Sequence, residues 1–504
     1  MSVPSEMGPG QLDEVWLPRE VETSHQIPDR LYGYVSVNSR GRYSALEAED
    51  LTDAQPFHGT QKDRRAARRA VESAGLTPTA DSRLGIAVVG PPGAYEELTG
   101  GEVVTRELLC YAEAGRRRYV THLDIVGDGQ PTTLGIGKVA SPSIPAEGVV
   151  LERPRLLQGI FPSPLPPPVS KFHLRVPDDV ALLLGAAAVH RRGHHGDGVV
   201  VAMVDSGQYA HPFFIAHGYD VRPTVTLLPD TDPSEDPVGH GTGESANIFA
   251  VAPGITLRPY RAANNQGDLV AAIAAFLRAK DDRPQVLTNS WGGDGPYPPP
   301  GPMDEWERVW ALEIRDAVEQ GIVVVFSAGN GSFTVEPQVP GVLAAGGAYV
   351  DPELRLMASN YASGYDSPWF GGVTVPTVCG LVGLLPRAQY GLYPVPPSCA
   401  IDQEEARAER GDPPDGTRED DGWAMFSGTS AAAPQLAGVA ALLLGAQNAL
   451  TPDAVVQAVT STAVDVRAGR CHPRFDNLAG PGIDLATGPG LVNARRALDS
   501  VLGS

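Results

Sequence analysis

Two uninterrupted apolar runs constrain the fold of this chain more than any other feature: Val-Val-Val-Ala-Met-Val at 199–204 and Ile-Val-Val-Val-Phe at 322–326. A strand without polar residues must be buried on both faces, which is typical of a parallel sheet covered by helices. Further strands are predicted at 256–260, 286–289 and 342–346, and helices at 269–279 and 306–320. The alternation predicts an α/β domain with a parallel sheet over residues 176–504.

Residues 30–150 follow a polar tail at 1–29 and have a different pattern, which predicts a small α+β domain. Strands are expected at 31–37, 84–89, 102–110 and 119–126, and helices at 62–74 and 94–98. The first helix carries Arg64, Arg65, Arg68 and Arg69. These arginines could form a nucleic-acid patch or a solvated, domain-contacting face, and the acidity of the whole chain favours the second interpretation.

The 504-residue chain is strongly acidic, since 60 Asp and Glu outnumber 39 Lys and Arg and give a formal charge of −21. Phosphate repels such a chain, so we expect neither nucleic acid nor a membrane as a partner. The N-terminal residues lack the basic start and apolar centre of a signal peptide, and no run approaches the ~18 apolar residues of a membrane span. We therefore expect a cytoplasmic protein. The four cysteines fit neither a disulfide framework nor a zinc site and are expected to be free thiols: Cys110, Cys379, Cys399 and Cys471.

Two segments interrupt these patterns. Residues 151–175 are dense in proline, above all at 162–168, and predict an extended linker between the two domains. Residues 369–425 contain an acidic stretch at 402–422, which predicts an exposed loop inserted into the larger domain.

Three motifs of the larger domain carry reactive side chains. Asp205 follows the first apolar run, and ligands of open parallel sheets bind beyond the carboxyl ends of the strands. His240 lies in Gly-His-Gly-Thr, and imidazole titrates near neutral pH, which suits a general base. Ser430 lies in Gly-Thr-Ser-Ala-Ala-Ala-Pro at the start of a predicted helix, where backbone donors stabilise negative charge. Taken singly, these residues could instead be a turn aspartate, a loop histidine and a helix-capping serine.

Together the three motifs fit one mechanism. A serine becomes a strong nucleophile when a base takes its proton and an acid orients that base. Asp205, His240 and Ser430 supply the acid, the base and the nucleophile. Asn330, in Ser-Ala-Gly-Asn-Gly after the second apolar run, offers an amide donor for the oxyanion of a tetrahedral intermediate.

In these motifs and in their order Asp, His, Ser, the region from about 176 to 498 resembles the subtilisin-like serine peptidases. The resemblance implies a serine endopeptidase that acts on protein or peptide substrates. It also implies the catalytic roles of Asp205, His240 and Ser430 and an oxyanion role for Asn330. Substrate-binding residues carried over in the same way are Ser290, Trp291, Gly292, Ala328 and Gly329. An apolar wall near Trp291 suggests apolar substrate side chains on the acyl side of the cleaved bond.

Some features depart from the family or extend beyond its motifs. The sequence after the histidine reads Gly243-Glu244-Ser245, where relatives usually carry a second histidine and small residues, and Glu244 is expected to affect the local pKa or the substrate preference. Relatives often bind calcium, but no acidic cluster marks a site, and no other cofactor is expected. The 30–150 domain resembles an inhibitory prodomain by position and by the linker after it, which would make the chain a zymogen with this domain docked on the catalytic one. An unrelated accessory domain is the alternative.

Two other functions are compatible with the same fold. If an amine rather than water resolved the acyl-enzyme, the protein would be a peptide ligase or macrocyclase, and segment 369–425 could shield the intermediate from water. A catalytically inactive binding scaffold is the second alternative. The intact motifs around Asp205, His240, Asn330 and Ser430 argue against it.

Overall fold

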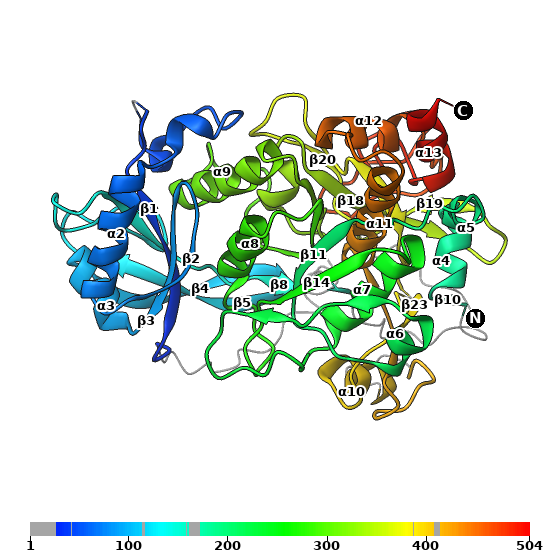
Figure 1. Ribbon diagram of the computed structural model, residues 1–504, viewed down its shortest axis with the longest axis horizontal. Coiled ribbons are helices and arrows are strands. Elements are labelled where there is room, and N and C mark those ends of the chain that lie inside the picture. Colours follow the sequence, from blue (N-terminus) through cyan, green and yellow to red (C-terminus); the bar gives the residue numbers. More distant parts are fainter. Residues whose placement is uncertain are drawn as a thin grey trace, which may run out of the picture.

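The computed structural model describes residues 27–503 except 42, 113–115, 158, 161–171, 387 and 408–413. Figure 1 shows a small N-terminal α+β domain, blue to cyan, beside a larger α/β domain, green to red. Helices α8 and α9 of the larger domain lie between its own sheet and the N-terminal domain. The predicted polar tail at 1–29 falls almost entirely outside the described residues.

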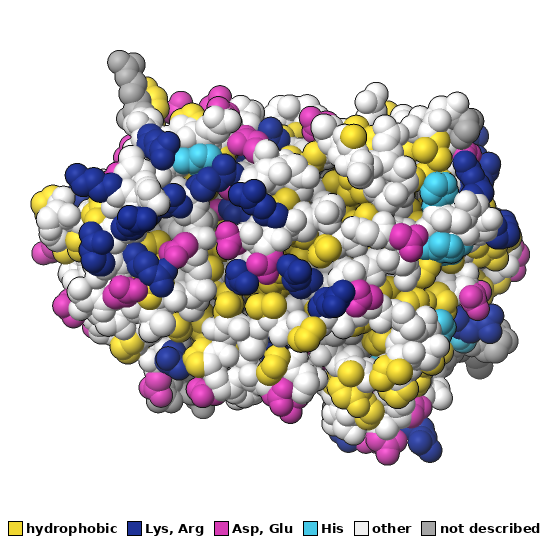
Figure 2. Space-filling view, viewed as in Figure 1, with side chains coloured by type: hydrophobic (Ala, Val, Ile, Leu, Met, Phe, Trp, Pro, Cys, Tyr) yellow, Lys and Arg dark blue, Asp and Glu magenta, His cyan; other side chains and the backbone are white. Residues whose placement is uncertain are grey.

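The N-terminal domain is built on a five-stranded antiparallel sheet in the order β2-β3-β1-β7-β6. The strands are β1 (Leu31–Val37), β2 (Thr77–Asp81), β3 (Gly85–Gly90), β6 (Ile136–Gly137) and β7 (Ala146–Leu151). A separate hairpin is formed by β4 (Glu102–Ala112) and β5 (Arg116–Val126). The helical elements are η1 (Ala45–Glu47), η2 (Gln55–Phe57), α2 (Gln61–Ser73) and α3 (Pro92–Thr99). Basic side chains gather over this domain on the face shown in Figure 2, and on α2 Arg68 pairs with Glu72 and Asp81.

The larger domain contains the predicted parallel sheet, in the order β12-β14-β11-β15-β17-β18-β19, with β13 on β14 and β22 on β18. All these pairs are parallel except β18 with β19. The strands are β11 (Val200–Asp205), β12 (Asp220–Val221), β13 (Val225–Thr226), β14 (Thr256–Arg261), β15 (Val286–Asn289), β17 (Val323–Ser327), β18 (Leu343–Val350), β19 (Leu356–Ala358) and β22 (Val378–Leu381).

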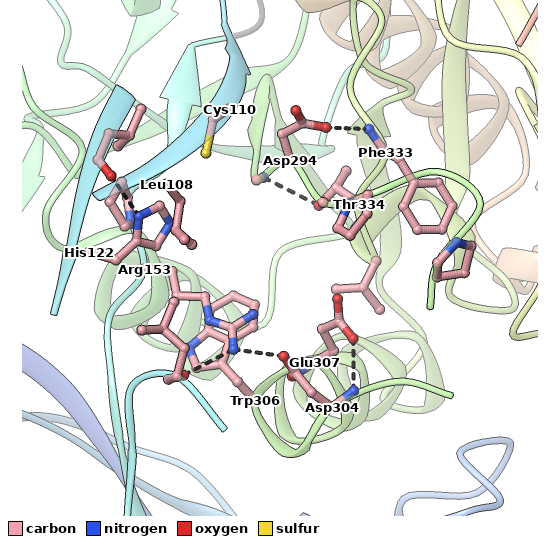
Figure 3. Close-up of a pocket in the computed structure, with 18 of the residues that line it drawn as sticks. Leu108, Cys110, His122, Arg153, Asp294, Asp304, Trp306, Glu307, Phe333 and Thr334 are labelled. Atoms are coloured by element: carbon pink, nitrogen blue, oxygen red, sulfur yellow. Dashed lines mark hydrogen bonds and ion pairs between the residues drawn. The ribbon is translucent and has the colours of Figure 1, made fainter. Parts of the chain in front are cut away.

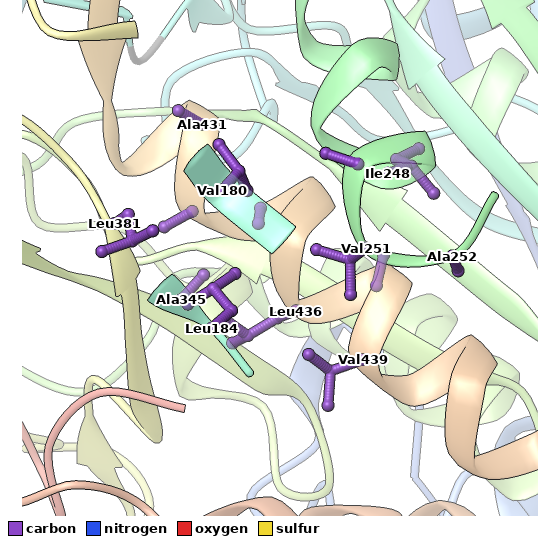
Figure 4. Close-up of a cluster of buried hydrophobic side chains, with 14 of the residues drawn as sticks. Val180, Leu184, Ile248, Val251, Ala252, Ala345, Leu381, Ala431, Leu436 and Val439 are labelled. Carbon is purple, nitrogen blue, oxygen red and sulfur yellow. The ribbon is translucent and has the colours of Figure 1, made fainter. Parts of the chain in front are cut away.

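Both faces of this sheet are covered by helices. On β11, Val201 and Met203 join the core under α7 (His240–Val251) and α11 (Thr429–Ala446), whereas Val204 joins the core under α8 (Ala272–Asp281) and α9 (Glu305–Glu319). Figure 4 shows the first of these cores, where Ile248 and Val439 belong to packed helices. The remaining helices are α4 (Asp178–Leu183), α5 (Ala186–His190), α6 (Pro212–His217), α10 (Ala400–Arg407), α12 (Pro452–Ser461) and α13 (Ala494–Leu502), together with η3 (Glu336–Gln338).

Helix α11 is the one described helix whose length and hydropathy would suit a membrane span, and 89% of it is buried inside the domain. Burial of this kind identifies it as a core helix. All four cysteines are buried thiols outside any disulfide, as the sequence predicted.

The expectation of an exposed acidic loop at 369–425 was wrong for most of this segment, although Arg418, Glu419 and Asp420 are exposed. Strand β22 belongs to the main sheet, and β23 (Gly391–Pro394) pairs with β24 (Trp423–Gly428), while α10 lies between them in the sequence. Asp402 and Asp415 are buried because their carboxylates accept backbone N–H groups, from Ser398 at 2.7 Å and Met425 at 2.8 Å. The short pair β20 (Tyr365–Asp366) and β21 (Thr374–Val375) adjoins this region.

The segment predicted as a plain linker at 151–175 also contains structure. Its first residue belongs to β7, and β8 (Leu156–Leu157) and β9 (Gly159–Ile160) pair with strands of the larger domain. After the proline-rich stretch, which lies outside the described residues, β10 (Leu174–Arg175) pairs with β23. Backbone pairing therefore attaches the segment to the larger domain at several points.

A buried network of charges joins the N-terminal domain to α8 and α9. Asp316 on α9 lies 2.9 Å from His58, 2.5 Å from Arg83 and 3.2 Å from Lys280. Lys280 also pairs with Glu313, whose carboxylate accepts hydrogen bonds from the hydroxyls of Tyr34 and Ser82. Burial by itself would raise the pKa of Asp316, but the hydrogen bond from His58 and the charges of Lys280 and Arg83 outweigh it and hold that pKa well below its ordinary value.

We predict that Asp316→Asn lowers the free energy of unfolding of the full chain by about 3 kcal/mol at pH 7, because it removes a buried carboxylate that bonds to His58, Arg83 and Lys280. Denaturant unfolding at pH 7 measures this loss. A group with a lowered pKa stabilises the protein above its unfolded-state pKa, so the difference between wild type and variant should shrink below about pH 4. Glu319→Gln, near the end of the same helix, is the control and should cost less than about 1 kcal/mol. Equal effects of the two substitutions would contradict the stabilising role of Asp316 in the charge network.

Candidate functional site

The site begins with Asp205 at the end of β11 and His240 at the start of α7. His240 Nδ1 lies 2.7 Å from Asp205 Oδ1, and each side chain is 1% exposed. The same carboxylate oxygen accepts the backbone N–H of Ser206 at 2.7 Å. The glycines around the histidine are required by close contacts: a Cβ at Gly239, where φ is +88°, would lie 2.4 Å from the Cys399 sulfur, and one at Gly241 would lie 2.3 Å from the Gly207 carbonyl.

Asp236, which the sequence did not single out, holds the two motifs together. Its carboxylate accepts the Ser206 hydroxyl at 2.8 Å and the backbone N–H groups of Gly239 and Thr242 at 3.0 and 2.9 Å. The N-cap residue of α7 is Gly239, which has no side chain to accept the N–H of Thr242, and Asp236 accepts it in its place. Its position four residues before His240 is the sequence feature from which this role could have been predicted.

Ser430 is the second residue of α11, and it is linked to Ser290 in both directions. The Ser430 hydroxyl donates to the Ser290 carbonyl at 3.2 Å, and the Ser290 hydroxyl donates to the Ser430 carbonyl at 2.9 Å. Pro434 lies in the second turn of α11. Since proline has no N–H, it cannot bond the Ser430 carbonyl four residues back, and the hydroxyl of Ser290 supplies a donor for it.

The predicted oxyanion residue also lies at this edge of the sheet. The side-chain oxygen of Asn330 accepts the backbone N–H of Thr429 at 2.9 Å and its hydroxyl at 3.0 Å, which fixes the orientation of the amide. The Thr429 hydroxyl also accepts the N–H of Gly329 at 3.2 Å. Thr429, the residue before Ser430 at the start of α11, is therefore bonded to the loop that carries Asn330.

The residues predicted to bind substrate lie in two segments: the loop that carries Asn330, and Ser290 with the strand that follows it. Ala328 and Gly329 lie in the loop that carries Asn330, and Gly329 has a φ of +105°. Trp291 and Gly292 form β16 directly after Ser290. The indole of Trp291 is fully buried and donates to the Val204 carbonyl at 2.8 Å, so this residue offers its backbone at the strand.

A segment of the chain itself lies along this strand. Leu157 of β8 pairs with Trp291 in antiparallel register, and Leu156 pairs with Gly292. On the other side of Ser430, Gly159 of β9 pairs with Gly428, and Ile160 pairs with Ser427. Gln158, the residue between the two strands, lies outside the described residues. On either side of position 158, the segment thus pairs with the strand that follows Ser290 and with the strand that precedes Ser430.

Glu244, one turn after His240 on α7, faces the other nitrogen of the imidazole. Its Oε1 lies 3.8 Å from His240 Nε2, its side chain is fully buried, and its Oε2 accepts the amide of Asn247 at 2.9 Å. Burial by itself would lower the pKa of His240, but Asp205 foremost, and then Glu244 and Asp236, outweigh it and raise that pKa to about 9. Burial raises the pKa of Glu244 to about 8 despite the opposing charge of His240. Among the described residues, His240 Nε2 has no hydrogen-bond partner, so Ser430 and His240 are not bonded to each other.

A cavity of about 310 Å³ lies beside this site, between the β4–β5 hairpin and the larger domain. Figure 3 shows His122 and Leu108 on the hairpin side, facing Asp294, Trp306 and Phe333. Among the described residues, no group of three or more His, Cys, Asp or Glu side chains is placed to hold a metal ion. The calcium site that the resemblance left open is therefore not assigned to any of them.

Comparison with known proteins places the chain in a family. The model of the subtilase family, peptidase family S8, matches residues 196–490, which is more than half of the chain. The chain belongs to the subtilase family. A probable subtilase-type serine protease of Deinococcus radiodurans is 28% identical over 64% of this chain and 43% of its own length. Bacillopeptidase F of Bacillus subtilis is 26% identical over 61% of this chain and 21% of its own length, so the chain spans less than half of either relative.

A solved structure shows the same fold. Fervidolysin from Fervidobacterium pennivorans, described as a keratinolytic enzyme related to subtilisin, aligns with a TM-score of 0.53 and 18% identity. The alignment covers 94% of this chain and 62% of that protein. It therefore takes in most of the N-terminal domain as well as the subtilase domain.

We predict that activity rises with pH as His240 loses its proton, and that Glu244→Gln shifts this rise to lower pH by about one unit. The substitution removes an anion that raises the pKa of His240. Glutamine keeps an oxygen for the Asn247 amide, so the fold should persist. The pH dependence of kcat/KM measures the shift. An unchanged midpoint would show that the Glu244 carboxylate does not influence the imidazole.

Proposed function

We propose that this chain is a serine endopeptidase, with Asp205, His240 and Ser430 as its catalytic triad. The proposal rests above all on one observation: a buried Asp205–His240 pair with a 2.7 Å contact lies at the sheet edge where an extended peptide segment passes Ser430 on paired strands. Membership in the subtilase family supports it.

In the proposed reaction, His240 Nε2 takes the hydroxyl proton of Ser430, and Ser430 Oγ bonds to the carbonyl carbon of the substrate. Asp205 holds the proton on Nδ1 and stabilises the imidazolium that forms. The Asn330 amide donates to the oxyanion. His240 then gives its proton to the leaving amine, and water, activated by the same imidazole, hydrolyses the acyl-enzyme.

The Ser430 hydroxyl must change partner for the first step. It donates to the Ser290 carbonyl in the structure, and a rotation about its χ1 would direct it toward His240 Nε2. Catalytic hydrogen bonds are often long or misaligned until a substrate is bound productively. A resting serine that is bonded to the peptide-binding strand is consistent with a chain held inactive by its own segment.

We further propose that the N-terminal domain is an inhibitory prodomain and that the enzyme cuts its own chain next to Gln158. The paired residues Leu157 and Gly159 flank that position, and the proposed nucleophile lies one helix residue beyond Thr429, close to the strand that binds Gly159. The charged contacts of Asp316 and Glu313 would hold the domain in place before and after the cut.

Ser430→Ala should abolish self-cleavage and lower peptide hydrolysis by about 10⁶-fold, since triad members act as a unit. Mass spectrometry of the purified chain over time measures the cut, which should separate residues 1–157 or 1–158 from the remainder. A fluorophosphonate probe should label the wild type but not Ser430→Ala. It should also label a Ser461→Ala control, which removes an exposed hydroxyl at the end of α12. Residual hydrolysis within tenfold of the wild type would reject the nucleophile.

Asn330→Ala should lower kcat by about 10²–10³-fold with little change in KM, because the amide acts once the oxyanion has formed. Steady-state kinetics on a peptide substrate measure both constants. A change confined to KM would mean that Asn330 binds the substrate in its ground state only.

A further inference from the structure

Arg155, the residue directly before β8, has a side chain that is only 1% exposed. Its guanidinium pairs with Glu336, whose side chain is fully buried, at 2.5 Å. The guanidinium carbon lies 4.2 Å from the ring centre of Trp306, with Trp310 at 5.5 Å and Trp291 at 5.7 Å. A planar cation is thus bonded to one carboxylate and surrounded by three aromatic rings, and the carboxylate of Glu152 on its own segment also acts on its charge.

The groups that enclose the arginine all belong to the subtilase domain. Glu336 is held in place by two further donors, the indole N–H of Trp310 at 3.0 Å and the hydroxyl of Thr334. Thr334 in turn accepts the backbone N–H of Gly293, the residue after β16, at 3.2 Å. The pocket is therefore built into the strand that pairs with β8, and it does not depend on the N-terminal domain for its carboxylate.

The neighbouring Arg153 shows what an ordinary arginine of this segment looks like. It lies 4.8 Å from the Trp306 ring and pairs with Asp304 at 2.7 Å, but its side chain is 20% exposed. Both arginines line the cavity of Figure 3, but the side chain of Asp304, the partner of Arg153, is 31% exposed, whereas Arg155 and its partner Glu336 are buried.

We infer that the Glu336 pocket is an arginine-binding substrate subsite, and that the enzyme selects peptides with arginine two residues before the position paired with Trp291. This inference rests on the proposed peptidase function, because it takes the β8 segment as a peptide lying in the cleft as a substrate would. If the bond after position 158 is cut, the selected arginine is the fourth residue before that bond.

The physical reason for selectivity is the burial of Glu336. A buried carboxylate is costly without a cation, so a peptide that offers an uncharged side chain leaves it unpaired. Arginine suits the pocket better than lysine because its flat guanidinium stacks on indole rings while it bonds the carboxylate. The sequence suggested an apolar preference near Trp291, and the buried ion pair changes that expectation to a cationic one.

Hydrolysis of synthetic peptides tests the inference. The parent peptide has the sequence of residues 152–161, Glu-Arg-Pro-Arg-Leu-Leu-Gln-Gly-Ile-Phe. Replacing the arginine that corresponds to Arg155 by citrulline, its uncharged analogue, should lower kcat/KM of the self-processed enzyme by at least about 30-fold. Replacing the arginine that corresponds to Arg153 is the matched control and should change it by less than threefold. The Glu336→Gln enzyme, which keeps an acceptor for Trp310, should cleave the parent and citrulline peptides alike.

Binding gives a readout that needs no catalysis. In the full chain with Ser430→Ala and Arg155→Ala, the segment that pairs with β16 has lost its arginine, and an added peptide competes with that segment for the strand and the pocket. Tryptophan fluorescence should report binding of the parent peptide at least about 30-fold tighter than the citrulline peptide, because both compete with the same segment. Adding Glu336→Gln should remove the difference. Hydrolysis without preference for arginine would overturn the subsite while leaving the peptidase proposal intact. Preferential binding without hydrolysis would reject the peptidase and keep the subsite, and absence of both would overturn both.

Discussion

The carboxyl ends of three neighbouring parallel strands meet at one edge, and every part of the site depends on that arrangement. Strand β11 ends at Asp205, β15 ends one residue before Ser290, and β17 leads to Asn330. No hydrogen bond among the site residues themselves would bring together positions so far apart in the sequence. The sheet brings them together because parallel strands all run in the same direction, so their carboxyl ends lie at the same edge.

Two helix starts complete the site, and both depend on local exceptions to regular backbone. His240 can begin α7 only because glycine precedes it in a left-handed conformation. Ser430 keeps a carbonyl that the helix does not use, because Pro434 withholds its N–H, and Ser290 bonds to it. The segment before β16 and the helix that carries Ser430 are thus joined by a hydrogen bond to a carbonyl that the helix leaves without its usual N–H donor.

Much of this arrangement could be predicted from the sequence, because apolar runs and glycine-framed motifs are local signals. Strand β15 has the predicted bounds 286–289, and Asp205 ends the strand that was expected to present it. Residues that act through distant contacts left no such signal. Glu336 meets Trp310 and Arg155 across 26 and 181 positions, and an acidic residue in a loop normally indicates solvent. The acidic segment near Asp402 was misjudged for the same reason, since its buried carboxylates are satisfied by backbone donors that composition does not reveal.

The contact between Arg155 and Glu336 has a consequence for how such a protein can evolve. On the two proposals above, one carboxylate binds both the segment that would keep the enzyme inactive and the peptides that the enzyme selects. A lineage that altered Glu336 to accept a different side chain would at the same time weaken the hold on its own segment. Inhibition by the segment and selectivity for substrates can therefore both be kept only if Glu336 and Arg155 are substituted together. The residue at position 155 would then indicate which side chain the pocket binds.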